Sequence, residues 1–302
     1  IKKVEGVYTM GYKVSKIKKY EWFDYVNTAL LLLWGFIVLY PFYNCVVVSL
    51  ASQTEYVKTP FMLFPKHIVF DSYLYLLRNN GLLNGYKSTL TIVSAGVVLN
   101  MLLTVATAFV LSRKKFPGKK FIFFFILFTM FFQGGLIPLY IVVKQLGLSN
   151  TLWSVILLYG INTFYLIITK NYFYTIPDSV EESAKIDGAN DITILFKIML
   201  PLCKPILATF TLFYAVDRWN EWFYSMLFIK KSSLIPLQVI VRNMVFVTLY
   251  EIKDNSFDSI DVFFGEGIKM AAIVLTMAPI MLVYPFLQRY FVKGLLVGAV
   301  KE

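Results

Sequence analysis

Six apolar runs, separated by polar segments, dominate the hydrophobic pattern of the chain. Each run reaches or approaches the ~20 consecutive apolar residues with which a helix crosses a bilayer. The pattern therefore predicts an all-α polytopic membrane protein with six transmembrane helices. The expected spans are residues 26–50, 88–111, 121–143, 151–169, 205–229 and 268–291.

The first run has a second interpretation. Ser49-Leu50-Ala51 resembles a signal-peptide cleavage site, which would make the run a leader that is removed. A signal core is usually about 7–15 residues long. The run at 26–50 is longer, which favours a retained span.

Composition agrees with a membrane protein. Of the 302 residues, 58% are hydrophobic, against about 45–50% in soluble domains. The net charge of +11 is explained by lysines and arginines in loops beside a membrane, so lipid is an expected partner and nucleic acid is not. Cys45 and Cys203 lie in or beside spans far apart in sequence, which indicates neither a disulfide framework nor a zinc site.

Basic residues are distributed unevenly between the two sides that six spans define. Eighteen lie on the side of the two termini and nine on the other. Cytoplasmic loops carry the excess of lysine and arginine, so both termini are expected in the cytoplasm. The layout is a cytoplasmic N-terminal segment (1–25), a six-span domain (26–292) with a cytoplasmic loop (171–204) and outer loops (51–86 and 230–267), and a cytoplasmic tail (293–302).

The loop 171–204 carries more helix signals than a simple connection needs. Gly188 is placed as a helix stop, and Asp191 can cap a second helix that ends before Pro201. A capping box at the start of the first helix fits in two registers, Ser179 with Glu182 and Asp178 with Glu181.

Small residues in this loop would let another protein pack closely. They are Ser183, Ala184, Gly188 and Ala189. The alternative is a capped amphipathic helix that lies at the membrane surface. Spacing alone does not separate the two interpretations.

Catalytic and metal-binding motifs are absent from the sequence. The nearest approach to a phosphate-binding loop starts at Gly81 and ends at Lys87-Ser88, but it has three residues where four are required. His67 is the single histidine, which excludes two-histidine zinc motifs. We expect no catalytic residue and no metal site in this chain.

The same loop resembles a known family signature. Glu182-Ser183-Ala184, followed by Gly188 and Ile198-Met199-Leu200-Pro201, resembles the EAA motif of permeases in binding-protein-dependent ABC importers, E-A-A-x3-G-x9-I-x-L-P, with Ser183 in place of the first alanine. Three further stretches resemble the sugar-importer (maltose/oligosaccharide-type) branch: residues 134–138, 219–223 and 290–301. The likeness runs from about residue 26 to the end.

The resemblance implies a type I ABC importer permease in a bacterial cell membrane, which moves an oligosaccharide inward. It implies four kinds of partner: a second, non-identical permease subunit, two cytoplasmic ABC ATPase subunits, an extracellular solute-binding protein and the oligosaccharide. ATP and Mg²⁺ would bind the ATPases, so this chain would hold no cofactor and would not be an enzyme. The residues implied in ATPase coupling are Glu181, Glu182, Ser183, Ala184, Asp187, Gly188 and Ala189.

Polar residues inside the expected fifth span are candidates for the substrate pathway. Ionisable groups at membrane depth usually face a bundle interior, a partner or a wet cavity. Two tryptophans beside them could offer a sugar a flat apolar surface, or could equally be packing in a structural polar network. Pairing within the helix, of Glu221 with Asp217 or Arg218, is also open. The candidates are Asp217, Arg218, Trp219, Asn220, Glu221 and Trp222.

Gln133-Gly134-Gly135 and Pro138 interrupt the expected third span. Free backbone groups at this depth are tolerated only where protein or water covers them. The interruption could shape the outer end of a pathway or be a simple packing kink.

A secondary, ion-coupled transporter of a small polar solute is the alternative function. Such proteins also have broken helices and buried charges. They are normally longer or show two similar halves, and this sequence shows no repeat. A membrane-bound transferase would need a cluster of acids or histidines at one face, which the sequence also lacks.

Overall fold

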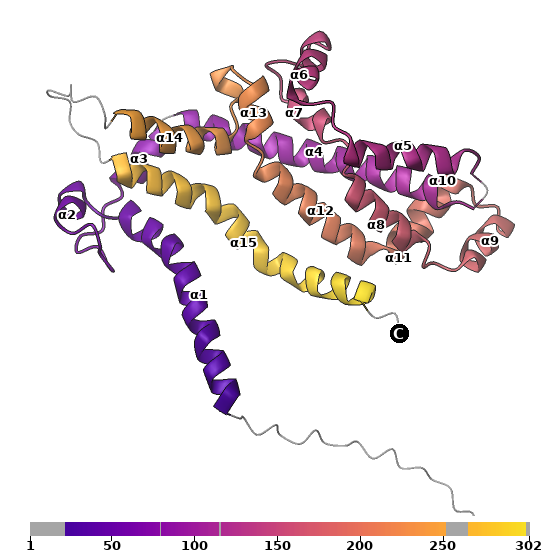
Figure 1. Ribbon diagram of the computed structural model, residues 1–302, viewed down its shortest axis with the longest axis horizontal. Helices are drawn as coiled ribbons and strands as arrows, with labels where there is room; N and C mark the ends of the chain where they lie inside the picture. Colours follow the sequence, from indigo (N-terminus) through magenta and orange to yellow (C-terminus); the bar gives the residue numbers. More distant parts are fainter. Residues whose placement is uncertain (1–21, 79, 115, 252–264, 300–302) are drawn as a thin grey trace, which may run out of the picture. The chain divides into compact units, whose positions relative to one another are not determined.

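Helices form all the regular structure in residues 22–78, 80–114, 116–251 and 265–299, the part of the chain that the computed structural model describes (Figure 1). The chain divides into two compact units, residues 1–45 and 46–302. The bounds are α1 Trp22–Ser49, α2 Gln53–Lys58, α3 Asp71–Arg78, α4 Asn80–Ser112, α5 Lys119–Phe131, α6 Leu136–Gln145, α7 Trp153–Leu158, α8 Thr163–Phe173, α9 Asp178–Ile186, α10 Asp191–Thr193, the π-helix η1 Ile194–Met199, α11 Leu200–Leu202, α12 Lys204–Trp219, α13 Phe223–Phe228, the 3-10 helix η2 Ser232–Leu234, α14 Leu237–Glu251 and α15 Gly265–Ala299.

Three helical stretches are long and apolar enough to cross a membrane: Trp22–Ser49, Gly81–Ser112 and Gly265–Pro285. They correspond to the first, second and sixth expected spans. Two bent helix pairs pass the same test together, α5 with α6 at 116° and residues 191–202 with α12 at 87°. By length and composition, the described residues therefore supply up to five spans.

The fourth expected span, 151–169, is two short helices, so a single helix here was a wrong prediction. α7 ends at Leu158, and α8 starts after Asn162. The Oδ1 atom of Asn162 accepts hydrogen bonds from the N–H groups of Phe164 and Tyr165, at 3.0 and 3.2 Å. A side chain that satisfies backbone donors in this way starts a new helix. An apolar run does not reveal such a break, because hydropathy does not report backbone hydrogen bonds.

The fifth expected span, 205–229, is broken as well. α12 ends at Trp219, and α13 begins at Phe223. The Oε1 atom of Glu221 accepts hydrogen bonds from the N–H groups of Tyr224 and Ser225, at 2.7 and 3.2 Å. It thereby satisfies donors that the first turn of a helix leaves free. The polar residues of this run lie at a helix break and not inside a continuous helix, which corrects the prediction.

The interruption expected near Gly134-Gly135 is confirmed. α5 ends at Phe131, and α6 begins at Leu136 after a sharp bend. Gly135 has φ of 88°, a backbone conformation that glycine adopts without the steric cost other residues incur.

Both expected outer loops contain helices that the polar pattern did not predict. The segment 51–86 holds α2, α3 and the first turns of α4, and the segment 230–267 holds η2 and α14. α14 packs against α4 and α15, with Leu237 fully buried. Tertiary packing of this kind stabilises a helix that its local sequence alone would not. α15 continues to Ala299, through most of the expected tail, while residues 1–21, 252–264 and 300–302 lie outside the described residues.

α4 is the central helix of the second unit, since it packs against α12, α8 and α14. One apolar cluster joins α4 to α8 and α12 through Ala108, Leu166 and Phe210, each no more than 2% exposed. A second cluster joins α4 to α14 and α15 through residues that include Leu82 and Leu237. Through the two clusters, α8, α12, α14 and α15 all pack against α4.

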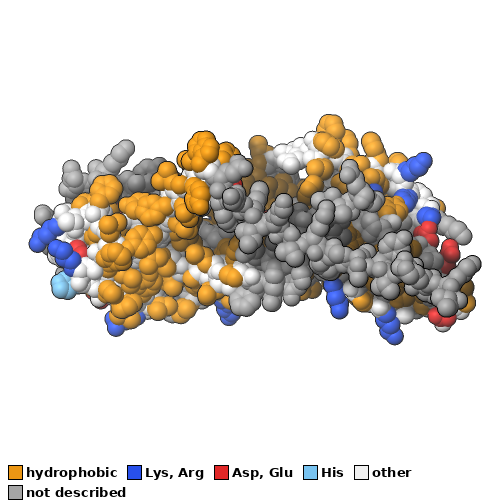
Figure 2. Space-filling view, turned by 90° about the horizontal axis from the view of Figure 1, so that it is seen from below, with side chains coloured by type: hydrophobic (Ala, Val, Ile, Leu, Met, Phe, Trp, Pro, Cys, Tyr) orange, Lys and Arg blue, Asp and Glu red, His pale blue; other side chains and the backbone are white. Residues whose placement is uncertain are grey.

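Apolar side chains cover much of the surface. Leu31 and Phe36 of α1 and Phe124 of α5 are each more than 60% exposed. Figure 2 shows hydrophobic side chains gathered in large groups on the visible surface. Patches of this extent would cause association in water. They suit contact with lipid acyl chains.

The contact between α4 and α14 generates a first prediction. A Cβ atom at Gly85 would lie 2.5 Å from Cδ1 of Ile240 and 3.2 Å from Cα of Leu237. Gly85→Val should therefore lower the free energy of unfolding by about 1–3 kcal/mol, the usual cost of overpacking. Thermal unfolding of the purified protein in detergent measures the effect. Ser94→Val, at an exposed position of α4, is the control, and equal melting temperatures for the two variants would contradict the contact.

Candidate functional site

The α9 helix ends as the sequence predicts. Gly188 has φ of 82°. The N–H of Ala189 donates to the carbonyl of Ala184 at 2.9 Å, and the N–H of Gly188 donates to the carbonyl of Lys185 at 3.1 Å. These two bonds form a Schellman motif, in which a left-handed residue satisfies the last carbonyls of a helix. The predicted stop at Gly188 is confirmed.

The expected start of α9 was wrong in both registers. Pro177 occupies the N-cap position, with no side-chain cap hydrogen bond. Asp178 and Ser179 lie inside the first turn, where Asp178 still interacts favourably with the positive end of the helix dipole. Proline fixes the backbone torsion φ before the helix, and its carbonyl accepts from the N–H of Val180 at 3.1 Å.

The second helix of the loop is capped one residue earlier than expected. Asn190, and not Asp191, is the N-cap, with its Oδ1 atom accepting from the N–H of Thr193 at 2.8 Å. The helical path then runs through the π-helix Ile194–Met199 and past Pro201, and it bends at Cys203. Proline is accommodated because it lies in the first turn of α11.

The small residues of the loop do not all face outward as predicted. Ala184 is 7% exposed, and both Ala184 and Ala189 pack against the apolar cluster of α4, α8 and α12. Glu182, Ser183, Asp187 and Gly188 are exposed. The two alanines therefore let α9 lie close to its own subunit.

Two exposed isoleucines were missed by the sequence analysis. Ile186 at the end of α9 is 86% exposed, and Ile192 in α10 is 70% exposed. They add apolar surface beside the exposed charged residues of this loop. The sequence did contain a signal for them, because each isoleucine stands beside a charged residue in a loop outside the apolar runs.

Glu181 is bound within the chain. It forms an ion pair with Arg113, and Nζ of Lys185 donates to its Oε1 atom at 2.7 Å. The guanidinium of Arg113 lies over the ring of Phe109, 4.1 Å from the centroid. Burial lowers the pKa of Arg113, but a guanidinium remains charged at any physiological pH. Glu181 therefore holds α9 to the end of α4, where we had expected it to be free for a partner.

Further contacts hold the basic turn after α4 against the start of α9. Lys114 forms an ion pair with Asp178, and Lys119 donates to the hydroxyl of Tyr174. The Tyr174 hydroxyl donates in turn to the carbonyl of Leu111 at 3.1 Å. A cavity of about 650 Å³ lies between this turn and α9. The turn and the helix are thus tied at several points around a shared cavity.

Arg218 occupies the centre of a second site. It is 3% exposed. Its Nε and Nη2 atoms donate to Oδ1 of Asn100 at 3.0 and 2.9 Å. Its two Nη atoms also donate to three carbonyls at the end of α7, those of Val155, Ile156 and Tyr159, at 2.8–3.1 Å. The guanidinium therefore satisfies carbonyls that the break after α7 leaves without helical partners.

The neighbouring carboxylates bind tyrosines. Asp217 accepts from the Tyr165 hydroxyl at 3.0 Å, and Glu221 accepts from the Tyr159 hydroxyl at 2.8 Å. Among the described residues, Glu221 forms neither an ion pair with Arg218 nor a hydrogen bond with Asp217, and its partners are instead Tyr159 and the backbone N–H groups across the break. Sequence spacing could not reveal these partners, because the tyrosines come from α7–α8.

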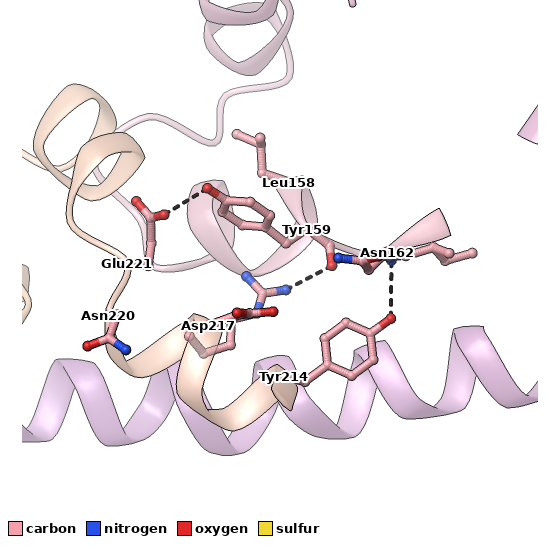
Figure 3. A pocket seen from close by; sticks show the side chains of 9 residues that line it. Leu158, Tyr159, Asn162, Tyr214, Asp217, Asn220 and Glu221 are labelled. Atoms are coloured by element: carbon pink, nitrogen blue, oxygen red, sulfur yellow. Dashed lines mark hydrogen bonds between the residues drawn. The ribbon is translucent and has the colours of Figure 1, made fainter. Parts of the chain in front are cut away.

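These side chains surround a pocket of about 360 Å³ (Figure 3). Figure 3 shows the Tyr159 hydroxyl directed to Glu221 and the Tyr214 hydroxyl directed to the backbone N–H of Asn162. The lining is Leu158, Tyr159, Ile161, Asn162, Tyr214, Asp217, Arg218, Asn220 and Glu221. The pocket offers mainly hydrogen-bond acceptors and hydroxyl groups, which suit a polyhydroxylated ligand.

The two candidate tryptophans lie outside this pocket. Trp219 is 7% exposed and packs in the cluster of α4, α14 and α15, with its ring centroid 6.4 Å from that of Tyr86. Trp222 is 39% exposed and lies beside Arg242. The packing interpretation therefore holds for Trp219. Among the described residues, no group of three or more histidine, cysteine, aspartate or glutamate side chains could hold a metal ion.

Comparison with known proteins gives a consistent result. Residues 89–297 match the family model described as "Binding-protein-dependent transport system inner membrane component". From Bacillus subtilis, Protein LplC is 39% identical, with 92% of this chain and 95% of that protein covered. The polygalacturonan/rhamnogalacturonan transport system permease protein YtcP of the same organism is 40% identical, with 92% and 98% covered.

A solved structure supports the same assignment. It is the crystal structure of a bacterial ABC transporter involved in the import of the acidic polysaccharide alginate, and the matching chain is 33% identical with a TM-score of 0.81. The match covers 89% of this chain and 96% of that chain. The fold is therefore that of a type I ABC importer permease, which is a transport component and not an enzyme. The chain belongs to the family of inner-membrane components of binding-protein-dependent transport systems.

Proposed function

We propose that this chain is one permease subunit of an ATP-driven importer that carries an oligosaccharide, and that α9 is the element gripped by the ATPase. The observation that carries the proposal is the geometry of α9. Its Glu182 and Ile186 side chains point away from the subunit, while Glu181 and Ala184 hold it to α4 and the core. A docked helix that is also braced can pass rigid-body motion to the helices behind it.

The proposed assembly contains a second, non-identical permease, two cytoplasmic ATPase subunits and an extracellular solute-binding protein. ATP and Mg²⁺ would bind the ATPases and not this chain. Two relatives that are named as sugar transport permeases support an oligosaccharide substrate: YtcP and the arabinooligosaccharides permease AraQ of Halalkalibacterium halodurans, which is 28% identical. Six spans with both termini and the α9 loop in the cytoplasm are part of the proposal.

The exposed residues of the α9 loop form the proposed surface for coupling to the ATPase. Glu182, Ser183, Ile186, Asp187 and Gly188 are available to a partner. Glu181, Ala184 and Ala189 have the different task of fixing α9 to its own subunit. The seven residues implied by the family resemblance therefore divide into an outward set and an inward set.

The pocket beside Arg218 is the proposed substrate pathway. The groups that reach it are Asp217, Asn220 and Glu221, together with the hydroxyls of Tyr159 and Tyr214. Arg218 lines it but uses its donors on Asn100 and the α7 carbonyls, so its part is to hold the pocket walls in place.

The backbone at Gly188 allows a direct test of coupling. Gly188→Val forces a β-branched residue into a left-handed conformation, at a cost of about 1–2 kcal/mol, and should disrupt the end of α9. We expect uptake to fall about tenfold or more while the complex still assembles. Uptake and ATP hydrolysis by the reconstituted complex measure the effect. Gly147→Val is the matched control, because Gly147 also has a positive φ, 69°, with no atom within 4 Å of an added Cβ. Equal loss of uptake in both variants would contradict the role of α9.

The ion pair between Arg113 and Glu181 predicts that replacing either residue will weaken the coupling of ATP hydrolysis to import. Arg113→Gln and Glu181→Gln should each raise the ATP hydrolysed per sugar imported, and the double variant should be no worse than one of them. A double-mutant cycle should give about 0.5–3 kcal/mol of interaction, as for residues in direct contact. Lys114→Gln is the control, since the Lys114–Asp178 pair is mostly exposed and such pairs contribute little. Strictly additive effects of the two substitutions would show that the Arg113–Glu181 ion pair does not hold α9 to the end of α4.

The buried guanidinium predicts a stability defect. Arg218→Met removes the guanidinium donors of the Val155 and Ile156 carbonyls and of Oδ1 of Asn100, whereas the Tyr159 carbonyl still accepts from Nδ2 of Asn100. Each buried acceptor left unpaired costs about 1–3 kcal/mol. We expect the free energy of unfolding to fall by about 3 kcal/mol or more, read from denaturation of the purified complex. Asp217→Asn keeps an acceptor for the Tyr165 hydroxyl and should change stability by less than about 1 kcal/mol. A wild-type melting temperature for Arg218→Met would show that the carbonyls have other partners.

A further inference from the structure

A third guanidinium, that of Arg242 on α14, lies between two exposed aromatic rings. Its Cζ atom is 4.8 Å from the ring centroid of Trp222 and 4.7 Å from that of Phe246. Its Nη1 atom is 3.2 Å from the sulfur of Met226. Trp222, Met226 and Phe246 are 39%, 37% and 48% exposed. These four residues form the Arg242 cluster.

Within the described residues, the guanidinium of Arg242 retains most of its hydrogen-bonding capacity. It has five N–H donors, and a thioether sulfur is a weak acceptor. In the described part of the chain no carboxylate lies within ion-pair distance of it, whereas Arg113 is paired with Glu181 and Arg218 is bound by Asn100 and backbone carbonyls. The aromatic rings fix its position and orientation. As far as the described residues go, the cluster therefore presents a fixed positive charge whose donors can bind a ligand outside the chain.

The chemistry of the cluster selects a ligand with two features. A planar guanidinium binds a carboxylate through two parallel hydrogen bonds, which a lysine does not reproduce. The aromatic faces and the flexible Met226 side chain suit an apolar surface beside that carboxylate. A uronic acid residue has both, since its ring has an apolar C–H face and its C6 is a carboxylate.

We propose that the Arg242 cluster binds a uronate residue of an acidic oligosaccharide during import. The inference rests on the proposed importer function and names its substrate class. Trp222 directly follows Glu221, so the cluster adjoins the pocket along the chain. Asp217 and Glu221 in that pocket repel a carboxylate but accept hydrogen bonds from hydroxyls. The cluster therefore takes the carboxylate, and the pocket takes the hydroxyls of a neighbouring sugar residue.

The test compares two ligands with the same sugar rings, one with ionised carboxylates and one with uncharged methyl esters. The complex of both permeases with the ATPases is placed in phosphatidylcholine nanodiscs without nucleotide or binding protein, and calorimetry measures binding of tetragalacturonate and of its fully methyl-esterified form. We expect tetragalacturonate to bind about tenfold tighter or more, as for a close charge pair. Added salt should reduce the difference.

Variants identify the source of the preference. Arg242→Gln should abolish the difference between the two ligands, and Arg242→Lys should keep only part of it. Trp222→Leu should weaken both ligands equally, because ring contact does not depend on charge. Lys231→Gln, at an exposed lysine between α13 and η2, should change nothing. Melting temperatures confirm that each variant complex is folded.

Several results would overturn the proposal. They are equal affinity for the two ligands, binding of neither, or a preference that persists in Arg242→Gln.

An anionic lipid headgroup is the competing ligand for a guanidinium. If Arg242→Gln instead lowers retention of phosphatidylglycerol and leaves tetragalacturonate unaffected, the cluster is a lipid site. Binding needs no ATP, so a Gly188→Val complex should keep the preference. If Gly188→Val loses coupling but keeps the preference for tetragalacturonate, both proposals stand. If coupling is normal and the preference is absent, only the proposal for the Arg242 cluster fails.

Discussion

The structure depends on the bonds that Arg218 makes to the broken end of α7. A bilayer offers no water to backbone groups, so an interrupted helix is tolerated only where protein satisfies the freed carbonyls. Arg218 and Asn100 do this from α12 and α4. Gly96 leaves the necessary room, because a Cβ atom there would lie 2.9 Å from Nε of Arg218. One buried cation thus fixes three helices and the wall of the pocket.

α4 connects the two candidate sites. Near its middle, Asn100 holds Arg218, and directly after its last turn Arg113 holds Glu181 of α9. Between these points α4 packs continuously on α8 and α12. A displacement of α9 would therefore act on a helix that already contacts the pocket walls. This spatial continuity identifies the residues at which energetic coupling between the two sites can be measured.

The sequence was sufficient for the helix type, the stop at Gly188 and the break at Gly135, because each has a strong local signal. It was insufficient for the breaks at Asn162 and Glu221, which depend on side chains that bond to backbone N–H groups in otherwise apolar runs. The partners of Arg218 come from distant parts of the chain, so no spacing rule could find them. The family signature located the α9 loop, but it could not show that Ala184 and Glu181 face inward.

The π-helix Ile194–Met199 gives a physical reason for the fixed spacing of the EAA signature. Nine residues separate Gly188 from Ile198, and six of the residues on the path from α10 to α11 lie in wider π turns. Each residue of an α-helix turns its successors by about 100°, and each residue of a wider π turn rotates them by less. Deleting one residue here would rotate Ile198 and Pro201 to another side of the helix axis and misalign α12 with α9. The number of residues between Gly188 and Ile198 therefore determines the direction in which Ile198 points, as well as its distance from Gly188.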